Sequence, residues 1–352
     1  MPNSIPDDQN TEPYLDLLAA ASRAYKDRTL VGTAQALFTV SSALFGPLMA
    51  WVNPNYKVWS AIWAVFVLII DEVLLEPSKE DKTKTGSKIQ ELFDTKLFRL
   101  PWNTMKCGPP PPTETLDELM RRYKAKHSGR SGTPNWYPAN IAEVSLAFAR
   151  LICQRANLVW DGGLRKNYAL LLKVIMILMG MGILVSGVAM GVTTDKFLLS
   201  IVVPVLPAMR RCFAEHKKQV TWVAENERLT GYLEALWTNS LKAPRMTDLE
   251  FVQESRRLQD ETFERRRQAP TVPSFLHHWF KDEYQRQMEA AAKEFVKQVV
   301  EIEDPEAVPS PAADGQTAAI SSANTVALPE LPPPTCSPQT GSDGPDPDPQ
   351  PA

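Results

Sequence analysis

The sequence predicts an all-α integral membrane protein with four transmembrane helices in two hairpins, a helical cytosolic body and a disordered C-terminal tail. Three observations support this fold class. Two pairs of apolar segments lie far apart in the chain, apolar residues recur at helical spacing between and after them, and proline is frequent near the C-terminus. Of the 352 residues 44% are hydrophobic and 22% are charged, which by itself resembles a soluble protein. The polar body dilutes the apolar segments, so local windows decide the fold class.

The first predicted hairpin covers residues 29–77 and follows a cytosolic N-terminal amphipathic helix at 1–28. Leu30 to Val52 contains no charged side chain. At a rise of about 1.5 Å per residue, this run is long enough to cross a hydrocarbon core of roughly 30 Å. The N-terminus lacks the basic and then apolar layout of a cleaved signal peptide, so we expect insertion to use the internal segments.

A turn-rich break at 53–57 separates this run from a second apolar run at 58–70. Two tryptophans near the break suit the aromatic belt at a membrane interface. Asp71 and Glu72 interrupt the second run before it reaches the roughly 20 residues of a full span, so two acids are expected near its far end.

The pattern recurs in a second predicted hairpin at 167–211. The run from 168 to 191 is apolar except for Lys173, which lies close enough to its start to extend toward the lipid headgroups. A break at 193–195 leads to a shorter apolar segment at 197–209. Two prolines in that segment predict a kinked fourth helix.

The distribution of lysine and arginine predicts the orientation of both hairpins. Basic residues flank each hairpin at its two outer ends, whereas the turns between paired helices carry only Lys57 and Lys196. By the positive-inside rule, the turns face away from the cytoplasm. We therefore expect a multi-pass protein with both termini and the middle segment in the cytoplasm.

The middle segment, residues 78–166, is predicted to be helical and cytosolic. Apolar residues at helical spacing in 87–100 indicate an amphipathic helix, and 116–126 reads as a short charged helix. Residues 128–135 are expected to form a loop. From Ile141 the helical period resumes and is expected to continue into the third span.

The segment at 212–303 is predicted to hold three more cytosolic helices. An apolar stripe continues from the fourth span and ends before Pro244, and charged helices are expected at 247–268 and 279–302. Residues 304–352 are rich in Pro, Ala, Ser and Asp and poor in large apolar side chains. Such a composition cannot offset the entropy lost on ordering, so this Pro-rich tail is predicted to be disordered.

The sequence contains no catalytic constellation and no metal-binding pattern. Cys212 and His216 share a helix face, but no second pair of ligands accompanies them, and the four cysteines lack CxxC spacing. No Walker-type or dinucleotide glycine loop is present. The net charge of −3 lacks the basic footprint of a nucleic-acid binder. We therefore expect no enzymatic activity, no metal, no cofactor and no nucleic-acid partner.

Charged residues close the second and fourth predicted spans on the same side of the membrane. Asp71 and Glu72 end the second span, and Arg210 and Arg211 end the fourth. Charges at such depths favour a functional role, here as a membrane gate or a charge pair. Simple anchoring of these side chains in the headgroup region is the alternative interpretation.

The third predicted span carries small residues that let helix backbones approach closely. These candidates for a helix-packing seam are Gly180, Gly182, Ser186, Gly187 and Gly191. Ordinary close packing is one interpretation, and a movable seam in a homo-oligomer is the sharper one.

Four stretches carry a resemblance to a known family. They read IQELFDTKLFRLPWN at 89–103, NWYP at 135–138, ARLICQRANLVWDGGLRKNY at 149–168 and RRLQDETFERRRQAPTVP at 256–273. With the two hairpins, they resemble the S-4TM family, the pore-forming four-helix effectors associated with SMODS nucleotidyltransferases. The resemblance covers about residues 10–300, and the sequence departs from the family pattern just after Pro273.

The resemblance implies a non-enzymatic anti-phage effector of the bacterial inner membrane. A partner nucleotidyltransferase would detect infection and make a cyclic nucleotide, and the effector would then damage the membrane in an abortive infection. The implied partners are the lipid bilayer, further copies of the chain and that enzyme, acting through its product. Planar guanidinium groups bind phosphates bidentately. Candidate contacts to the cyclic nucleotide are Arg150, Arg155, Arg165, Arg256, Arg257, Arg265, Arg266 and Arg267, for which a solvated basic face is the alternative.

Two other functions stay open at this point. The chain could be a non-toxic membrane scaffold or small channel. It could also be an enzyme in which Asp94, Asp161 or Asp260 supplies a carboxylate, although the lack of paired histidines or a metal pattern argues against this.

Overall fold

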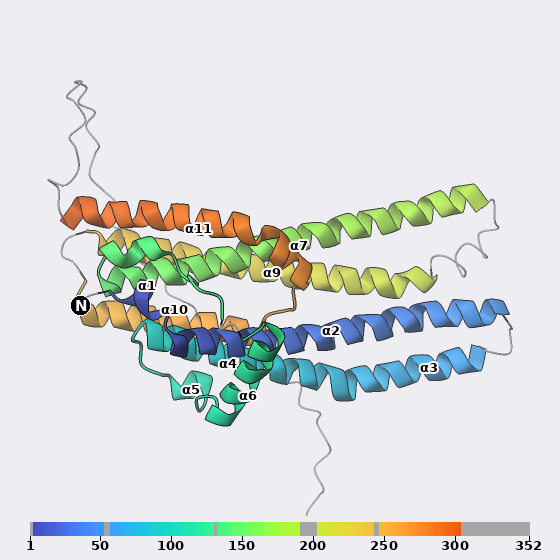
Figure 1. Cartoon of the computed structure of the whole chain (residues 1–352). Helices are drawn as coiled ribbons and strands as arrows, with labels where there is room; N and C mark the ends of the chain where they lie inside the picture. The colour runs from blue at the N-terminus through green and yellow to red at the C-terminus, as the bar shows by residue number, and fades with distance from the viewer. Residues whose placement is uncertain (1–2, 53–56, 130–131, 191–202, 243–245, 304–352) are drawn as a thin grey trace, which may run out of the picture. The chain divides into compact units, whose positions relative to one another are not determined.

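Every regular element in the described part of the chain is helical, as the sequence predicts. The computed structural model describes residues 3–52, 57–129, 132–190, 203–242 and 246–303 (Figure 1). These residues belong to one compact unit, residues 1–316. The predicted turns near 55 and 194, the small residue Gly191 and the predicted tail at 304–352 lie outside the described residues.

The first long helix joins two segments that the sequence analysis kept apart. A short helix α1 (Ile5–Asp8) is followed by α2 (Glu12–Val52), which continues from the N-terminal segment into the first apolar run without a break. Pro13 lies in the first turn of α2, where its missing N–H removes no hydrogen bond. The N-terminal helix and the first predicted span are therefore one rigid element.

The second apolar segment likewise continues into a body helix. Helix α3 (Lys57–Ile70) passes through a π-helical turn η2 (Asp71–Leu75) into α4 (Glu76–Leu97). The predicted amphipathic helix at 87–100 is the last part of α4. A π-helical turn inside an α-helix often lies at a functional site.

Short elements connect the two long pairs. Helix α5 (Thr104–Cys107) was not predicted, whereas α6 (Thr113–Lys126) confirms the short charged helix. Next comes η3 (Ala139–Glu143), a 3₁₀ turn, so the regular helix begins slightly later than the expected Ile141.

The second half of the chain contains the longest helix and its partner. Helix α7 (Leu146–Met190) continues into the third predicted span as expected, and α9 (Val203–Ser240) ends before Pro244 as predicted. Helix α10 (Asp248–Gln268) starts with a capping box in which Thr247 and Glu250 bond to each other's backbone N–H groups.

Helix α11 (Ser274–Glu303) starts five residues earlier than predicted. Pro273 lies just before its first turn, and the carbonyl oxygen of Pro273 accepts a hydrogen bond from the Leu276 N–H at 3.1 Å. Proline is tolerated at this position because a helix start needs no donor there. Pro270 and Pro273 therefore lie in the linker between α10 and α11, and they do not delay the start of α11.

The long helices pair, and α10 joins the pairs. Helix α7 packs along α9, α2 packs along α4 and α3, and α10 contacts both α4 and α7 (Figure 1). Helix α11 covers α7 and η3. The core is formed mostly by large apolar side chains of the body, including Phe93, Phe98, Ile141, Leu151, Leu229, Leu233 and Phe263.

Helix α7 has two different halves. In its body half, residues 146–165, nine consecutive side chains from Leu146 to Gln154 are buried. In its apolar half, residues 168–190, large apolar side chains are exposed, among them Leu184 at 68% and Val188 at 86%. Within the described residues, α7 is the one helix long and apolar enough to cross a membrane.

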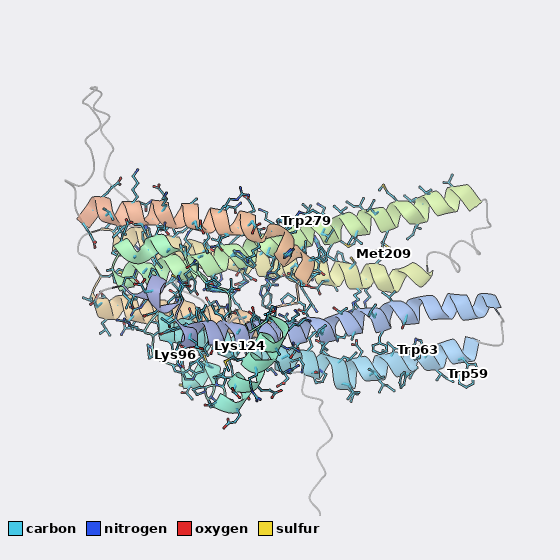
Figure 2. All side chains as sticks on the ribbon, viewed as in Figure 1. Trp59, Trp63, Lys96, Lys124, Met209 and Trp279 are labelled. Atoms are coloured by element: carbon cyan, nitrogen blue, oxygen red, sulfur yellow. The ribbon has the colours of Figure 1, made fainter. Side chains whose placement is uncertain are left out.

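The other apolar segments expose similar side chains. Leu37 on α2 is 66% exposed, and Leu68 on α3 is 68% exposed. Trp59 and Trp63 lie in the first turns of α3, toward its end away from the body (Figure 2).

Candidate functional site

Two carboxylates without solvent exposure lie where α4 faces α10. The side chains of Glu91 and Asp94 both have zero exposure. They lie three residues apart on α4, so they share one face of the helix. Gln259 on α10 joins them, because its Nε2 donates to Glu91 Oε2 at 2.8 Å and to Asp94 Oδ2 at 3.1 Å.

Two arginines of α10 neutralise this pair. Arg256 Nη2 lies 2.6 Å from Glu91 Oε1, and Arg266 Nη1 lies 2.6 Å from Asp94 Oδ2. Arg256 also pairs with Asp260 at 2.8 Å. Removing one partner from a buried ion pair leaves an uncompensated charge, so loss of either arginine should strongly destabilise the folded state.

A buried tyrosine completes the group that we call the polar core: Glu91, Asp94, Tyr137, Arg256, Gln259 and Arg266. Tyr137 is 1% exposed, and its hydroxyl donates to Asp94 Oδ1 at 2.7 Å and accepts from Asn157 Nδ2 at 2.7 Å. The Tyr137 backbone is held by Gln9, which bonds to both its N–H and its carbonyl. All four stretches that carry the family resemblance therefore meet at this point.

The protein environment raises the pKa of both Glu91 and Arg266 in the polar core, for different reasons. Burial raises the pKa of Glu91, although the charge and hydrogen bond of Arg256 act against the shift. Desolvation disfavours the charged form of Arg266, but the neighbouring charge of Asp94 outweighs it and raises the pKa of Arg266. Arg266 is therefore a permanent cation inside the body.

A second set of contacts, which we call the linker clamp, holds the chain between α10 and α11. Arg28 on α2 donates to the Ala269 carbonyl at 2.5 Å, and Arg165 on α7 donates to the Pro270 carbonyl at 3.0 Å. Both arginines are buried. Arg28 directly precedes the apolar part of α2, and Arg165 precedes that of α7. The clamp thus ties two long helices together at the level where their apolar parts begin.

Polar side chains of α7 and α9 extend the clamp. Asp161 pairs with Arg165 at 2.8 Å and accepts from Asn226 Nδ2 at 2.9 Å. Gln219 accepts from Arg165 Nη1 at 3.1 Å. Desolvation works against the charged form of Asp161, but the Arg165 charge lowers its pKa overall.

The other predicted phosphate contacts are scattered over the body. Arg150 is buried and donates to the Phe98 carbonyl at 2.6 Å. Arg265 donates to the Trp222 carbonyl at 2.8 Å, and desolvation lowers its pKa to about 10. Both are fixed by the chain itself. The structure therefore does not gather the eight predicted arginines at one surface.

Three of the predicted arginines keep access to solvent. Arg155 pairs with Glu234 at 2.8 Å and retains 21% exposure of its side chain. Arg257 is exposed and stacks over the Tyr232 ring. Arg267 pairs with Glu264 and retains 37% exposure.

Of the two acids that follow α3, Asp71 makes a polar contact with α2, and Glu72 lies next to that contact. Gln35, a buried residue of α2, donates to Asp71 Oδ1 at 2.8 Å and to Glu76 Oε2 at 2.7 Å. Glu72 is exposed, as are Arg210 and Arg211 on α9. In the described residues no ion pair joins Arg210 to either acid. The predicted charge pair stays a prediction, and it must compete with the Gln35 contact.

The predicted helix-packing seam is only partly described. A Cβ added at Gly180 would meet no atom within 4 Å, so that glycine does not serve packing inside this chain. Gly182 is exposed. The surroundings of Ser186 and Gly187, like Gly191 itself, lie outside the described residues.

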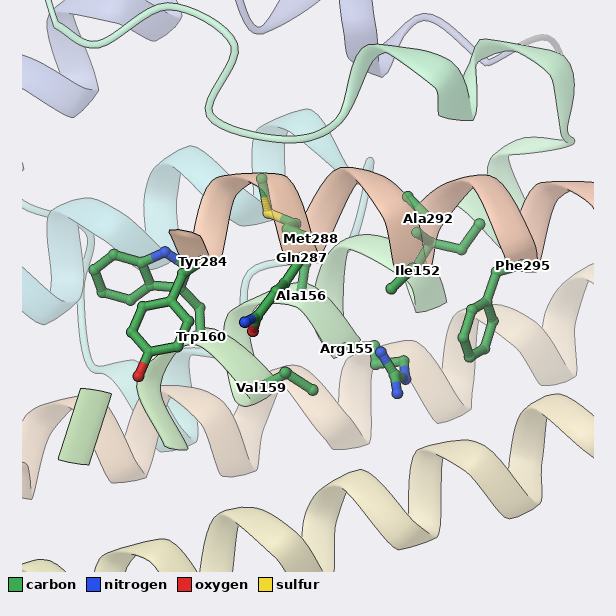
Figure 3. Close-up of a pocket in the computed structure, with 11 residues that line it drawn as sticks. Ile152, Arg155, Ala156, Val159, Trp160, Tyr284, Gln287, Met288, Ala292 and Phe295 are labelled. Carbon is green, nitrogen blue, oxygen red and sulfur yellow. The ribbon is translucent and has the colours of Figure 1, made fainter. Parts of the chain in front are cut away.

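A shallow groove lies between α7 and α11, away from the polar core. It is lined by Ile152, Arg155 and Trp160 of α7 and by Tyr284, Met288 and Phe295 of α11 (Figure 3). The Arg155 guanidinium lies 4.7 Å from the centre of the Phe295 ring. The lining is mostly apolar, and nothing in it has the arrangement of an acid–base pair or nucleophile.

The carboxylates named for an enzymatic function are all engaged by protein groups. Asp94 is bound by Arg266, Asp161 by Arg165, and Asp260 by Arg256 and Asn103. In the described residues no cluster of His, Cys, Asp and Glu could hold a metal ion. The arrangement is suited to holding helices together through buried charge.

Sequence analysis missed several residues of this site. Glu91, Tyr137 and Gln259 lie in stretches that carry the family resemblance, but nothing local showed that they are buried. Arg28 is one of the basic residues that flank the first predicted hairpin, and only its charge was used there. Gln35 had a visible signal, because it is a polar side chain with hydrogen-bonding groups inside an otherwise apolar run.

Comparisons with known proteins agree with the resemblance found in the sequence. The profile of the SMODS-associating 4TM effector domain matches residues 3–295. A protein of Bacillus cereus (strain VD146), described as a probable CBASS effector molecule, is 25% identical over 205 residues, which cover 56% of this chain and 67% of that protein. No solved structure matches the chain. The match covers the long helices, the polar core and most of α11, and the chain belongs to the SMODS-associating 4TM effector family.

Proposed function

We propose that this chain is an effector of a CBASS-type anti-phage system, and that it spans the bacterial inner membrane with four helices and breaches it when activated. Family membership and the likeness to a probable CBASS effector support this function. The single structural observation that carries the mechanism is the continuity of the helices. Each described apolar segment belongs to the same helix, or helix pair, as a segment of the body.

Continuity matters because a helix transmits displacement along its length. The body parts of α2, α4, α7 and α9 are fixed by the linker clamp and by the polar core with α10. The apolar parts of α2, α3 and α7 expose large apolar side chains, and Gln35 of α2 makes a polar contact to Asp71 and Glu76. A rearrangement of α10 therefore has to shift or rotate the apolar segments.

The signal we propose is a cyclic nucleotide made by a partner nucleotidyltransferase. A ligand that binds one arrangement about a hundredfold better than the other supplies roughly 2.7 kcal/mol of bias, which shifts the population substantially. Arg155, Arg257 and Arg267 are the predicted contacts that a phosphate can reach without breaking a buried pair. Arg256 and Arg266 instead hold α10 to α4, and α10 is the helix that the signal must rearrange.

The glycine face of α7 is the proposed seam between copies of the chain. Helices in lipid associate through close backbone packing, and small residues allow several arrangements of similar energy. The open surroundings of Gly180 support a seam that faces outward from the chain. Bulky substitutions such as Gly180→Leu, Gly187→Leu or Gly191→Leu should then alter membrane damage without lowering abundance.

The test is leakage of a dye from liposomes that hold equal amounts of wild-type or variant protein, with and without the nucleotide product. Gly231→Leu is a matched control, because Gly231 lies exposed on the body part of α9 and a Cβ there meets no atom within 4 Å. Unchanged leakage in every seam variant would remove the seam from the mechanism. Absence of nucleotide-dependent leakage in the wild type would leave the scaffold or small-channel alternative, and turnover of nucleotide would support an enzyme.

The proposed topology has its own test. Both turns should face the periplasm, so single cysteines at Asn55 and Thr194 should react with an impermeant maleimide in intact cells. Cys107 and Cys153 are buried and do not report the side of the membrane, so Met105→Cys, where Met105 is 99% exposed, is the control for the cytoplasmic side. Labelling of the middle segment in intact cells would overturn the orientation.

A further inference from the structure

The first turns of α11 expose two large aromatic side chains. Phe275 is 53% exposed and Trp279 is 77% exposed. They lie four residues apart, so they share one face of the helix, while Leu276 and Tyr284 face the core. Beyond Trp279 the exposed residues of α11 are mostly charged or polar. The aromatic surface is therefore confined to the start of the helix.

Contacts between α7 and α11 fix the level at which this start lies. The Tyr284 hydroxyl accepts from Asn167 Nδ2 at 2.7 Å, and its ring packs on Gly163. Eleven residues further along α11, Phe295 lies against Arg155, which precedes Gly163 on α7. The two helices are thus antiparallel between Tyr284 and Phe295, and the centre of the His277 ring lies 5.0 Å from that of Trp160 of α7.

The start of α11 lies where the apolar half of α7 begins. Leu276 packs in one cluster with Leu164, Tyr168 and Leu171, and Arg165 holds the Pro270 carbonyl just before the helix. Leu170 is 59% exposed and Val174 is 44% exposed, and both lie in the first turns of the apolar half of α7. The aromatic side chains therefore continue the exposed apolar surface of α7 toward the body. Figure 2 shows Trp279 on α11 near the place where α7 leaves the body.

Exposed lysines surround the same level. Helix α9 runs antiparallel to α7, with Gln219 bonded to Arg165 and Cys212 Sγ 4.0 Å from the Leu172 carbonyl. This register places Lys217 and Lys218 level with Lys166, seven residues before Lys173 on α7, and Lys281 follows Trp279 by two residues on α11. All five lysines are exposed. A belt of lysine beside exposed tryptophan and phenylalanine is the composition of a membrane–water interface.

We propose that the start of α11 is an interfacial anchor, in which Phe275 and Trp279 insert into the headgroup region of the phospholipid bilayer and the surrounding lysines meet lipid phosphates. Trp suits this location because its ring is apolar and its indole N–H still finds a polar partner. The inference rests on the proposed function in one respect, since it takes the apolar half of α7 to lie in a bilayer. It adds a contact with lipid from a helix outside the four spans.

The anchor holds the start of α11 at the bilayer surface, next to the linker that the clamp binds. The linker that Arg28 and Arg165 hold at Ala269 and Pro270 leads directly into the anchored turn. Because α11 is fixed at the bilayer surface, α10 moves relative to α11 when it rearranges, and the two helices do not move together.

The anchor is tested with the full-length chain in vesicles of phosphatidylethanolamine and phosphatidylglycerol. Photoreactive benzoylphenylalanine replaces one residue at a time, and covalent lipid adducts are measured by mass spectrometry. Positions 275 and 279 probe the anchor, and position 68 on α3 probes a predicted span. Position 249 is the matched control outside the membrane, because Leu249 is 66% exposed and Phe251, next to it on α10, packs on Phe148 at the far end of α7.

The expected result is lipid adducts at positions 68, 275 and 279 and none at 249. Adducts at 68 without adducts at 275 and 279, or adducts from 279 to a second copy of the chain, would overturn the anchor and leave the spans intact. Adducts at 279 without any at 68 would instead support surface binding and count against the proposed spans.

A second measurement uses the probe at 275 in a Trp279→Asp background. Trp279 makes little contact with the core, so the substitution should not unfold the chain. Lipid adducts at 275 should fall about tenfold, which corresponds to about 1.4 kcal/mol. Leu249→Asp should leave them unchanged. Equal adduct yields in the two backgrounds would overturn the contribution of Trp279.

Discussion

The two halves of helix α7 differ in composition and have opposite environments. From Leu146 to Gln154 every side chain is buried by other helices, and Arg150 and Gln154 are buried among them with partners in the chain. From Leu170 onward large apolar side chains are exposed. The body half thus packs on protein and holds charged and amide side chains that find partners. The apolar half carries one charged residue, Lys173.

The comparison predicts that the largest effect comes from breaking a buried charge in the body. Asp94→Ala removes the partner of Arg266 and of Tyr137 and should destabilise the fold by about 3–5 kcal/mol, because a buried cation is left unpaired. The measurement is thermal unfolding of the purified protein in detergent. Arg286→Ala breaks an exposed pair with Glu283 and should cost less than about 1 kcal/mol. Equal losses would show that the polar core does not stabilise the body.

Two glycines on α7 compare its halves directly. A Cβ at Gly163 would lie 2.8 Å from Cε1 of Tyr284, whereas a Cβ at Gly180 would meet nothing within 4 Å. Gly163→Ala should therefore destabilise the docking of α11, by about 1–3 kcal/mol as an overpacked site. Gly180→Ala should leave stability unchanged or slightly raised, because alanine favours a helix by up to about 1 kcal/mol. Hydrogen exchange along α11 reports the first effect separately from global unfolding, and unchanged exchange in Gly163→Ala would contradict this docking.

The boundary between an apolar segment and the body is tested at Asp71, in the turn between α3 and α4. If Asp71 or Glu72 pairs with Arg210 or Arg211, one single charge reversal should cost on the order of 1–3 kcal/mol, and the matching double reversal should recover it. Strictly additive effects would mean that no pair exists and that Gln35 alone satisfies Asp71. Gln35→Leu is the companion variant, because it removes the donor to both Asp71 and Glu76.

The smallest predicted effect is a pH dependence inside the body. Burial raises the pKa of Glu91 above its ordinary 4.5, so the folded state binds this proton more tightly than the unfolded state does. The contribution of Glu91 to stability therefore grows as the pH falls from 7 toward 5. The stability difference between wild type and Glu91→Gln should shift in favour of the wild type over this range.

Asp161→Asn is the control for the pH experiment. The Arg165 charge overcomes desolvation and lowers the pKa of Asp161 below its ordinary 3.8. Its contribution to stability is present above that value and is lost only as the pH falls through the lowered pKa. The difference between wild type and Asp161→Asn should stay constant between pH 7 and 5, and a parallel change in both variants would point to another group.

The sequence by itself determined most helices, the apolar segments and the family, because helix formation and membrane hydropathy depend on residues that are neighbours in the chain. The start of α11 was predicted too late because Pro270 and Pro273 were taken to delay the helix. The continuity of α2 across residue 28 was also missed, since a change in composition there was read as a boundary. Neither error concerns the type of element.

Only the tertiary structure decided what the arginines do. Arg256 and Arg266 look like a basic surface in the sequence, but their partners Glu91 and Asp94 lie 165 and 172 residues away. The same holds for Arg28, whose acceptor Ala269 is 241 residues distant. Local periodicity carries no information on such pairings, because they depend on which helix faces pack together. Burial then converts exposed charges into ion pairs that hold the body, for the physical reason that an unpaired charge away from water is too costly to keep.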